Sequence, residues 1–275
     1  MADKTYENVV IERDGEVTFL YLNRPEKRNA MSPGLHYDMQ DALLNLDHDE
    51  KTKVLVLGGK GEAWCAGQDI KAYFREQAND PVARRKSNNT SHNWRHDLLT
   101  HFSKPTIAMV QGYCFGGAFT QLSSCDFAVA ADEAIFGLSE VNWGILPGGI
   151  VSWNLTDMLL PRHAMYYAAT GEPFNGKRAV EIGLVNESVP RAQLMAKTME
   201  LAGKLLKLNP AVVRYTKEAI RAVRRMGHEE ARDYLAVKQD AMHKADKEIG
   251  EKVGMKEFLD AKSYRPGLGP YKRPT

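Results

Sequence analysis

The sequence has few cysteines, and they show no pattern that would build a disulfide framework. Three occur among 275 residues, at positions 65, 114 and 125, in apolar or glycine-rich surroundings. An odd number without regular spacing argues for reduced thiols rather than for a small secreted domain. Residues 1–14 are polar and charged, unlike a secretory signal peptide. We therefore expect a cytoplasmic protein.

The sequence also lacks an excess of charge and any long apolar run. The formal net charge is +2, which gives no electrostatic reason to expect a nucleic-acid partner. No run of about 18 apolar residues is present, so we expect no membrane-spanning helix. His92 and His96 lie one helical turn apart, but no neighbouring Cys or Glu completes a metal site. We expect a solvated helix face there and no bound metal.

The hydrophobic pattern predicts an α/β body followed by a helical tail. Residues 9–12 and 17–22 alternate apolar with polar around a turn, which indicates a β-hairpin. Ser32-Pro33 is typical of a helix start, and the helix that follows has an apolar stripe at 35, 39, 43, 44 and 46. Further strands are expected at 53–57, 106–110, 127–130, 134–136 and 184–189.

From about Arg191 the strand signals stop. Helices are expected from residue 210, over 228–244 and over 250–260. We therefore divide the chain into a core at 1–205 and a helical region at 206–275 that serves packing or oligomerisation.

Two glycine-rich turns are candidates for binding an oxygen atom. The segment 62–71, Glu-Ala-Trp-Cys-Ala-Gly-Gln-Asp-Ile-Lys, follows a predicted strand and opens a helix, and the segment 115–119, Phe-Gly-Gly-Ala-Phe, has the same character. Such turns leave backbone N–H groups free and let a ligand approach closely. If the turns face each other, one N–H from each forms an oxyanion hole. The alternative is that each turn serves only tight packing. Neither turn carries the glycine pattern of a triphosphate or dinucleotide site.

A single carboxylate, Glu140, accompanies these turns. The position twenty residues earlier is Thr120 and not a second acid. Glu140 is either a catalytic acid–base group or a structural acid that caps the following turn. Opposite two oxyanion turns, the catalytic interpretation is favoured. The basic cluster of Arg24, Lys27 and Arg28 is likewise either a solvated turn or a phosphate contact.

Several segments resemble landmarks of the crotonase (enoyl-CoA hydratase/isomerase) superfamily, in the same order along the chain. They are 23–30, 63–70, the stretch that begins at Gly112, and 136–140, and the tail at 254–258 extends the match to nearly the whole chain. The resemblance implies the crotonase fold, a spiral of ββα units with a C-terminal helical trimerisation region, and trimers usually paired into hexamers. It also implies an acyl-CoA substrate and no separate cofactor, because coenzyme A is part of the substrate.

The same resemblance assigns residues to the acyl-CoA site. It implies that the N–H groups of Gln68 and Gly117 hold the thioester carbonyl. Phe258 and Lys262 would reach the CoA of a neighbouring subunit, although the lysine is one residue from the usual spacing. The residues implied to contact CoA within the chain are Lys27, Arg28, Ala66, Asp69, Ile70 and Lys71.

Within the superfamily, the chain looks most similar to bacterial hydroxycinnamoyl-CoA hydratase-lyases. Those enzymes convert feruloyl-, caffeoyl- or p-coumaroyl-CoA to the aromatic aldehyde and acetyl-CoA. They have a small hydroxyl residue where ordinary hydratases have the first glutamate, as Thr120 does here. The resemblance implies that Tyr73 contacts the para-hydroxyl group of the substrate and that Glu140 is the catalytic acid–base. The residues implied to line the substrate pocket are Phe119, Thr120, Ser139, Trp143 and Gly148.

One position departs from that pattern. Family members can place a second phenol-binding tyrosine at the position of Ala236, two residues beyond Tyr234. Taken alone, Tyr73 would by default be an ordinary core or surface tyrosine, and only the resemblance to the lyases favours a functional role. Trp143 is either an aromatic wall for the substrate ring or, equally well, an ordinary packing residue.

Two other functions stay open from the sequence. One is another crotonase chemistry, such as enoyl-CoA hydration, isomerisation or thioester hydrolysis, although an aliphatic hydratase is expected to keep a carboxylate at position 120. The other is a non-catalytic binding protein with the crotonase fold, against which the near-neutral charge and Glu140 argue.

Overall fold

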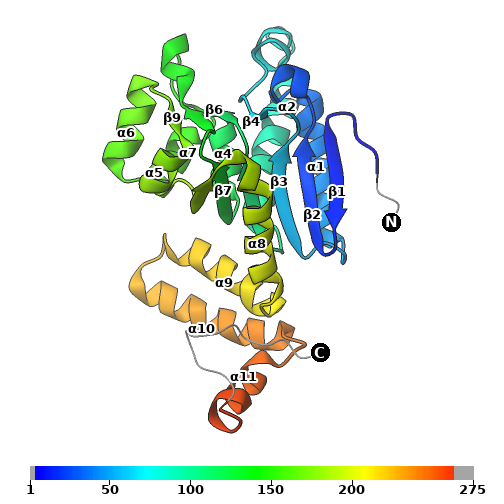
Figure 1. Ribbon diagram of the computed structural model, residues 1–275. Coiled ribbons are helices and arrows are strands. Elements are labelled where there is room, and N and C mark those ends of the chain that lie inside the picture. The colour runs from blue at the N-terminus through cyan, green and yellow to red at the C-terminus, as the bar shows by residue number, and fades with distance from the viewer. Residues whose placement is uncertain (1–3, 263–275) are drawn as a thin grey trace.

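A six-stranded sheet lies at the centre of the α/β body (Figure 1). The computed structural model describes residues 4–262, and the strands of this sheet follow the order β1-β2-β3-β5-β7-β10. β1 (Val9–Asp14) and β2 (Val17–Leu22) form the predicted antiparallel hairpin, and the remaining neighbours are parallel. The other strands are β3 (Val54–Gly59), β5 (Thr106–Val110), β7 (Phe127–Ala131) and β10 (Glu187–Val189).

A second, smaller sheet has the order β4-β6-β8-β9. Its strands are β4 (Ala63–Cys65), β6 (Tyr113–Phe115), β8 (Ile135–Gly137) and β9 (Phe174–Asn175). The chain passes from β3 to β4, from β5 to β6 and from β7 to β8, and helical segments follow each pair. This repetition is the spiral of ββα units that the sequence resemblance implies.

Helices cover the sheets, and the first of them shows why they form. In α1 (Pro33–His48) the Ser32 hydroxyl accepts from the N–H of Leu35 at 3.2 Å, as the predicted cap requires. Its apolar stripe is buried, except that Leu44 is 47% exposed. The other helical segments of the body are η1 (Pro25–Lys27), η2 (Ile70–Arg75), α2 (Pro81–His92), η3 (Asn93–Leu98), α3 (Leu99–His101), α4 (Ala118–Ser124), η4 (Ser139–Trp143), α5 (Val151–Met158), α6 (Pro161–Thr170), α7 (Gly176–Glu181), η5 (Arg191–Gln193) and α8 (Leu194–Leu206).

Two sequence-based expectations about the body are wrong in part. The strand predicted at 184–189 is only β10, because the N–H groups of Leu184 and Val185 both donate to the carbonyl of Ala179 and so terminate α7. The predicted solvated histidine face is also incomplete. His92 is exposed, but His96 is half-buried with its ring 5.5 Å from that of Trp153. Within residues 4–262, no cluster of His, Cys, Asp and Glu is placed to hold a metal ion.

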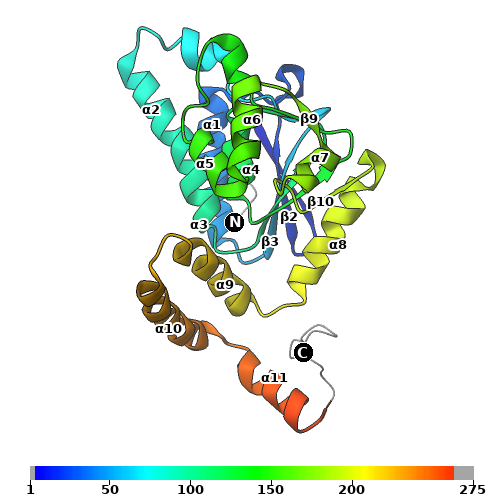
Figure 2. The same ribbon diagram turned by 90° about the vertical axis from the view of Figure 1, so that its left-hand side faces the viewer.

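The C-terminal helices α9 (Pro210–Val223), α10 (His228–Ala245) and α11 (Gly250–Leu259) lie below the body, with α11 farthest from it (Figures 1 and 2). None of the helices within residues 4–262 combines the length and apolar character needed to cross a membrane.

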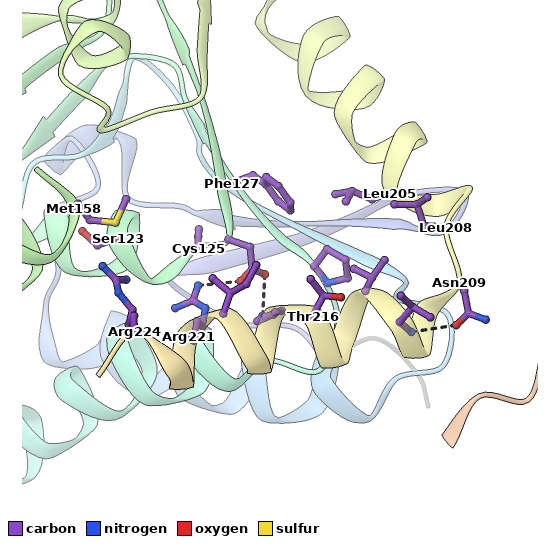
Figure 3. A pocket seen from close by; sticks show the side chains of 16 residues that line it. Ser123, Cys125, Phe127, Met158, Leu205, Leu208, Asn209, Thr216, Arg221 and Arg224 are labelled. Atoms are coloured by element: carbon purple, nitrogen blue, oxygen red, sulfur yellow. Dashed lines mark hydrogen bonds and ion pairs between the residues drawn. The ribbon is translucent and has the colours of Figure 1, made fainter. Parts of the chain in front are cut away.

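A buried ion cluster joins α9 to the body. Asp126 accepts from Lys217 at 2.8 Å and from Arg221 at 2.9 Å, and it also accepts from the N–H and hydroxyl of Thr106 at the start of β5. The side chains of Asp126 and Lys217 are only 9% and 7% exposed. Beside this cluster lies a mostly apolar cavity of about 650 Å³, which Phe127 and Leu205 help to line (Figure 3).

The Asp126 cluster predicts a large stability effect. Replacing Asp126 with Asn removes the carboxylate and leaves two cations facing each other, so the free energy of unfolding should fall by about 3–5 kcal/mol. Urea unfolding followed by circular dichroism measures this. The control is Glu200→Gln, which removes exposed pairs with Lys197 and Lys204 and should cost less than about 1 kcal/mol. Equal losses of unfolding free energy in the two variants would contradict the conclusion that Asp126 joins α9 to the body.

Candidate active site

The two glycine-rich turns lie against each other. β4 and β6 are neighbouring parallel strands, with Cys65 opposite Cys114, and each turn follows the carboxyl end of its strand. A Cβ atom added to Gly67 would lie 2.8 Å from the carbonyl oxygen of Phe115 and 3.7 Å from the amide nitrogen of Gly117. The backbones therefore approach so closely that position 67, where φ is +90°, accepts only glycine.

The amide N–H groups of Gln68 and Gly117 are free to bind a ligand. The backbone of Met31 bonds to the residues on both sides of Gln68. The N–H of Met31 donates to the carbonyl of Gly67 at 2.8 Å, and the carbonyl of Met31 accepts from the N–H of Asp69 at 3.0 Å. In the part of the chain that the structure describes, neither the Gln68 N–H nor the Gly117 N–H donates to a protein acceptor. One free N–H on each facing turn is the arrangement that an oxyanion hole needs.

A buried polar chain holds Gln68, and sequence analysis missed it. The Nε1–H of Trp94 donates to Nδ1 of His36 at 2.8 Å, so Nε2 of His36 carries the proton and donates to Oε1 of Gln68 at 2.9 Å. Gln68 in turn donates to the Ser91 hydroxyl at 3.2 Å. Burial, together with the nearby charge of Arg95, lowers the pKa of His36 to about 3. His36 is therefore a neutral structural link at physiological pH.

Glu140 directs its carboxylate at the second turn. A Cβ atom at Gly116 would lie 3.1 Å from Oε1 of Glu140, and Gly116 itself has φ +51°. Burial raises the pKa of Glu140, and its Oε2 is buried without a hydrogen-bond partner among residues 4–262. The backbone carbonyl of Glu140, and not its carboxylate, accepts from the N–H of Ile145. This geometry favours a chemical role over the structural cap.

Tyr73 and Thr120 each have hydrogen-bonding capacity left over. Tyr73 is 8% exposed, and its hydroxyl donates to Oδ1 of Asn88 at 2.6 Å. Its ring meets that of His36 edge-on at 5.3 Å. Because its proton is directed to Asn88, the Tyr73 oxygen keeps lone pairs that can accept a hydrogen bond. Thr120 is fully buried, and its hydroxyl has no partner among the described residues.

The residues implied to contact CoA divide into two groups. The carbonyl of Arg28 accepts from the N–H of Ala66 at 3.0 Å, so the basic turn lies beside the first glycine turn. Lys27, Arg28, Ile70 and Lys71 are all exposed there. Asp69 differs, because its carboxylate accepts from the N–H of Ala72, which caps η2, and pairs with Arg24 at 3.1 Å. Its side chain has a structural role.

The residues implied to line the substrate pocket are less uniform. Phe119 is completely buried, with its ring 6.4 Å from that of Phe136, as a core residue would be. Trp143 is 68% exposed, Gly148 is exposed and Ser139 is half-buried.

The tail residues lie apart from this site. Phe258 lies on α11, at the far end of the helical segment from the β4 and β6 turns, and Lys262 lies three residues after that helix (Figure 1). Within one chain the structure does not bring these residues to the other CoA residues. Ala236 is exposed on α10, and Tyr234 is half-buried.

This combination of fold and paired turns defines the class of protein. The family model described as enoyl-CoA hydratase/isomerase matches residues 12–265, and the chain belongs to this family. The chain is 49% identical over 269 residues, 98% of each chain, to the hydroxycinnamoyl-CoA hydratase-lyase of Pseudomonas fluorescens. It is 30% identical over 256 residues, 93% of this chain and 96% of the other, to the crotonyl-CoA hydratase of Syntrophomonas wolfei.

Solved structures agree with this assignment. An enoyl-CoA hydratase structure from Geobacillus kaustophilus superposes with a TM-score of 0.83 at 32% identity, covering 96% of this chain and 98% of the other. The enoyl-CoA hydratase of Mycobacterium smegmatis gives a TM-score of 0.85 at 25% identity, covering 94% and 98%. The crotonase fold expected from the sequence is thereby confirmed.

The close approach at Gly67 predicts a sensitive position. Gly67→Ala should lower kcat/KM at least about a hundredfold, the scale of losing one oxyanion donor, because the first turn must move away from the second. The control is Gly183→Ala. Gly183 also has a positive φ, +80°, but a Cβ there meets nothing within 4 Å. That variant should lose about 1–2 kcal/mol of stability and keep its activity. Steady-state kinetics and thermal unfolding of both variants measure these effects. Full activity in Gly67→Ala would contradict the assignment of the two turns as an oxyanion hole.

Proposed function

We propose that the protein hydrates a 4-hydroxycinnamoyl-CoA thioester, such as feruloyl-, caffeoyl- or p-coumaroyl-CoA, and then cleaves it to the aromatic aldehyde and acetyl-CoA. The observation that carries this proposal is the division of groups around the paired turns. Glu140 offers a carboxylate whose Oε2 has no hydrogen-bond partner among the described residues, whereas Thr120 offers a hydroxyl where a second acid would stand. The similarity to a hydroxycinnamoyl-CoA hydratase-lyase supports the same conclusion.

The substrate is bound at both of its ends. The thioester carbonyl accepts from the N–H groups of Gln68 and Gly117, each of which contributes about 3–4 kcal/mol to stabilising an oxyanion. The para-hydroxyl group donates to the oxygen of Tyr73, whose own proton is directed to Asn88. Exposed Lys27, Arg28, Ile70 and Lys71 line the CoA.

Hydration uses the phenol of the substrate in place of a second acid. As its proton is drawn toward Tyr73, electron density moves through the conjugated chain to the thioester oxygen, and the β-carbon becomes electrophilic. Glu140 takes a proton from water as the oxygen adds to the β-carbon, and it then delivers that proton to the α-carbon. A raised pKa suits Glu140 to both transfers, because the group must accept and release a proton near neutral pH.

Cleavage reverses the direction of proton flow. Glu140 removes the proton of the β-hydroxyl group, the Cα–Cβ bond breaks, and the aldehyde leaves. The electron pair of that bond passes into the thioester and gives the acetyl-CoA enolate. The N–H groups of Gln68 and Gly117 bind the enolate oxygen, as they bound the carbonyl oxygen. Protonation of that enolate at carbon by Glu140 gives acetyl-CoA. No metal or further cofactor enters this scheme.

The assembly belongs to the same proposal. The C-terminal helices form a trimer that pairs into a hexamer, Phe258 and Lys262 contact the CoA of a neighbouring subunit, and the enzyme acts in the cytoplasm. The exposure of Phe258, at 45%, supports a contact outside its own chain.

Product analysis with two substrates tests the reaction class. Feruloyl-CoA should give vanillin and acetyl-CoA, while crotonyl-CoA should show little water addition, because it has no phenol to activate the β-carbon. Glu140→Gln should lower kcat with feruloyl-CoA at least about a hundredfold with little change in CoA affinity. Since burial raises the pKa of Glu140, the acid limb of the kcat/KM profile should lie above the ordinary carboxyl range.

The matched control is Glu62→Gln, at an exposed position just before β4, which should retain wild-type kinetics. Efficient hydration of crotonyl-CoA without aldehyde from feruloyl-CoA would identify an ordinary hydratase instead. Survival of activity in Glu140→Gln would remove Glu140 from the mechanism.

Tyr73 should matter only for substrates with a para-hydroxyl group. Tyr73→Phe removes the acceptor of a hydrogen bond from a phenol group that gains positive charge as its electrons delocalise, about 1.5–3 kcal/mol, so feruloyl-CoA turnover should fall roughly ten- to hundredfold. Turnover of cinnamoyl-CoA, which lacks the para-hydroxyl group and should be slow with the unaltered protein, should not change. Tyr166→Phe, which removes an exposed hydroxyl that donates to Glu172, is the control. Undiminished feruloyl-CoA turnover in Tyr73→Phe would leave the phenol mechanism without support.

A further inference from the structure

Arg95 is a buried cation next to the candidate active site. It lies on η3 and is 5% exposed. Its Nε donates to the carbonyl of Ser91 at 3.0 Å, and its Nη1 donates to the carbonyl of Gly117 at 2.8 Å. Both acceptors are neutral, and within residues 4–262 no carboxylate forms an ion pair with Arg95.

This lack of a counterion sets Arg95 apart from Lys217, whose side chain is 7% exposed and pairs with Asp126. Arg24, which is half-buried, likewise pairs with Asp69. Burial lowers the pKa of Arg95 to about 10, and the proximity of Tyr73 and then Cys65 raises it, so the guanidinium still carries its charge at neutral pH. A buried charge without a partner is unfavourable, which makes its retention informative.

The location of the charge indicates what would pair with it. Nη1 of Arg95 would lie 3.2 Å from a Cβ atom added to Gly117, and it donates to the carbonyl of Gly117. Arg95 therefore holds the carbonyl of the same residue whose N–H forms half of the oxyanion hole. The charge of the guanidinium also helps to lower the pKa of His36, which contacts both Gln68 and Tyr73. Arg95 therefore stands behind the oxyanion turn, within electrostatic range of Tyr73.

The proposed substrate connects both of these places through one conjugated system. As the phenol donates its hydrogen bond to Tyr73, electron density shifts from the phenol oxygen toward the thioester oxygen, where negative charge builds up. A cation fixed in a region of low dielectric constant stabilises such a charge more strongly than it would in water. An aliphatic enoyl-CoA has no phenol to supply this electron density, so its charge develops only within the thioester enolate.

We propose that Arg95 is a positioning residue that favours conjugated aromatic thioesters: its fixed charge stabilises the negative charge that the polarised substrate gathers toward its thioester oxygen, and its hydrogen bond holds Gly117 in the oxyanion turn. This inference rests on the proposed function, because it is the 4-hydroxycinnamoyl group that supplies the charge. It also explains how a site with one carboxylate, Glu140, manages the hydration step.

The absorption of the substrate reports this polarisation directly. In the slow Glu140→Gln background, bound feruloyl-CoA should absorb at longer wavelength than free feruloyl-CoA, because the field of Arg95 draws charge along the chromophore. Adding Arg95→Gln, which can still donate hydrogen bonds but has no charge, should abolish most of this shift. Adding Arg95→Lys, which keeps the charge, should retain part of it. A residue with only a structural role would not move this spectrum while the protein stays folded.

Steady-state kinetics give the second readout. With otherwise wild-type protein, Arg95→Gln should lower kcat for feruloyl-CoA about a hundredfold, while KM changes less than about threefold. Arg95→Lys should recover at least about tenfold of that loss. The control is Arg85→Gln, which removes an exposed arginine of α2 and should leave both constants unchanged. Circular dichroism verifies that each variant is folded.

The outcomes separate this inference from the proposed function. If the unaltered protein does not convert feruloyl-CoA to vanillin, the proposed function is wrong. If it does, and Arg95→Gln keeps the red shift and the wild-type kcat, the role of Arg95 is wrong. If the Arg95 variants do not fold, the spectrum of feruloyl-CoA bound to the Glu140→Gln protein is the test. Because Arg95 is in place there, an unshifted spectrum overturns the inference.

Discussion

The contact between two backbone turns is the constraint on which the rest of this site depends. Gly67 meets the carbonyl of Phe115 at a distance that excludes a side chain, and this contact exists because β4 and β6 are adjacent parallel strands. The free N–H groups on both turns, the carboxylate of Glu140 over Gly116 and the guanidinium of Arg95 behind Gly117 are all placed relative to it. A shift of one turn would change every one of these relations.

Two charges of opposite sign, the half-buried Glu140 and the buried Arg95, lie beside this contact without pairing with each other. Among residues 4–262, Oε2 of Glu140 has no hydrogen-bond partner, and Arg95 binds only neutral carbonyl groups. Each charge alone destabilises the fold, and the large hydrophobic core of the two sheets offsets that cost. A site built this way is preorganised, because its dipoles and charges are already oriented before a ligand arrives.

The sequence predicted those features that depend on neighbours along the chain. The helix start at Ser32-Pro33, the hairpin, the glycine turns and the isolated carboxylate of Glu140 are all local patterns. His36, Trp94 and Arg95 could not be found in this way, because their importance comes from partners 22 to 58 positions away, such as Gly117 for Arg95 and Trp94 for His36. On α1 the histidine merely interrupts an apolar stripe. The strand expected at 184–189 was wrong in part because an apolar run does not reveal that its first amides serve the end of α7.

The Asp126 cluster has a consequence for how the chain is divided. Asp126 binds both the start of β5 and two cations of α9, and β5 leads directly into β6 and the second glycine turn. Opening α9 would therefore loosen a central strand, so the two form one cooperative unit in local unfolding. The change from mixed to purely helical sequence near residue 206 is a boundary in secondary structure. The contacts of Asp126 cross that boundary, and α10 is attached in turn to α9 through the ion pair between Lys238 and Glu218.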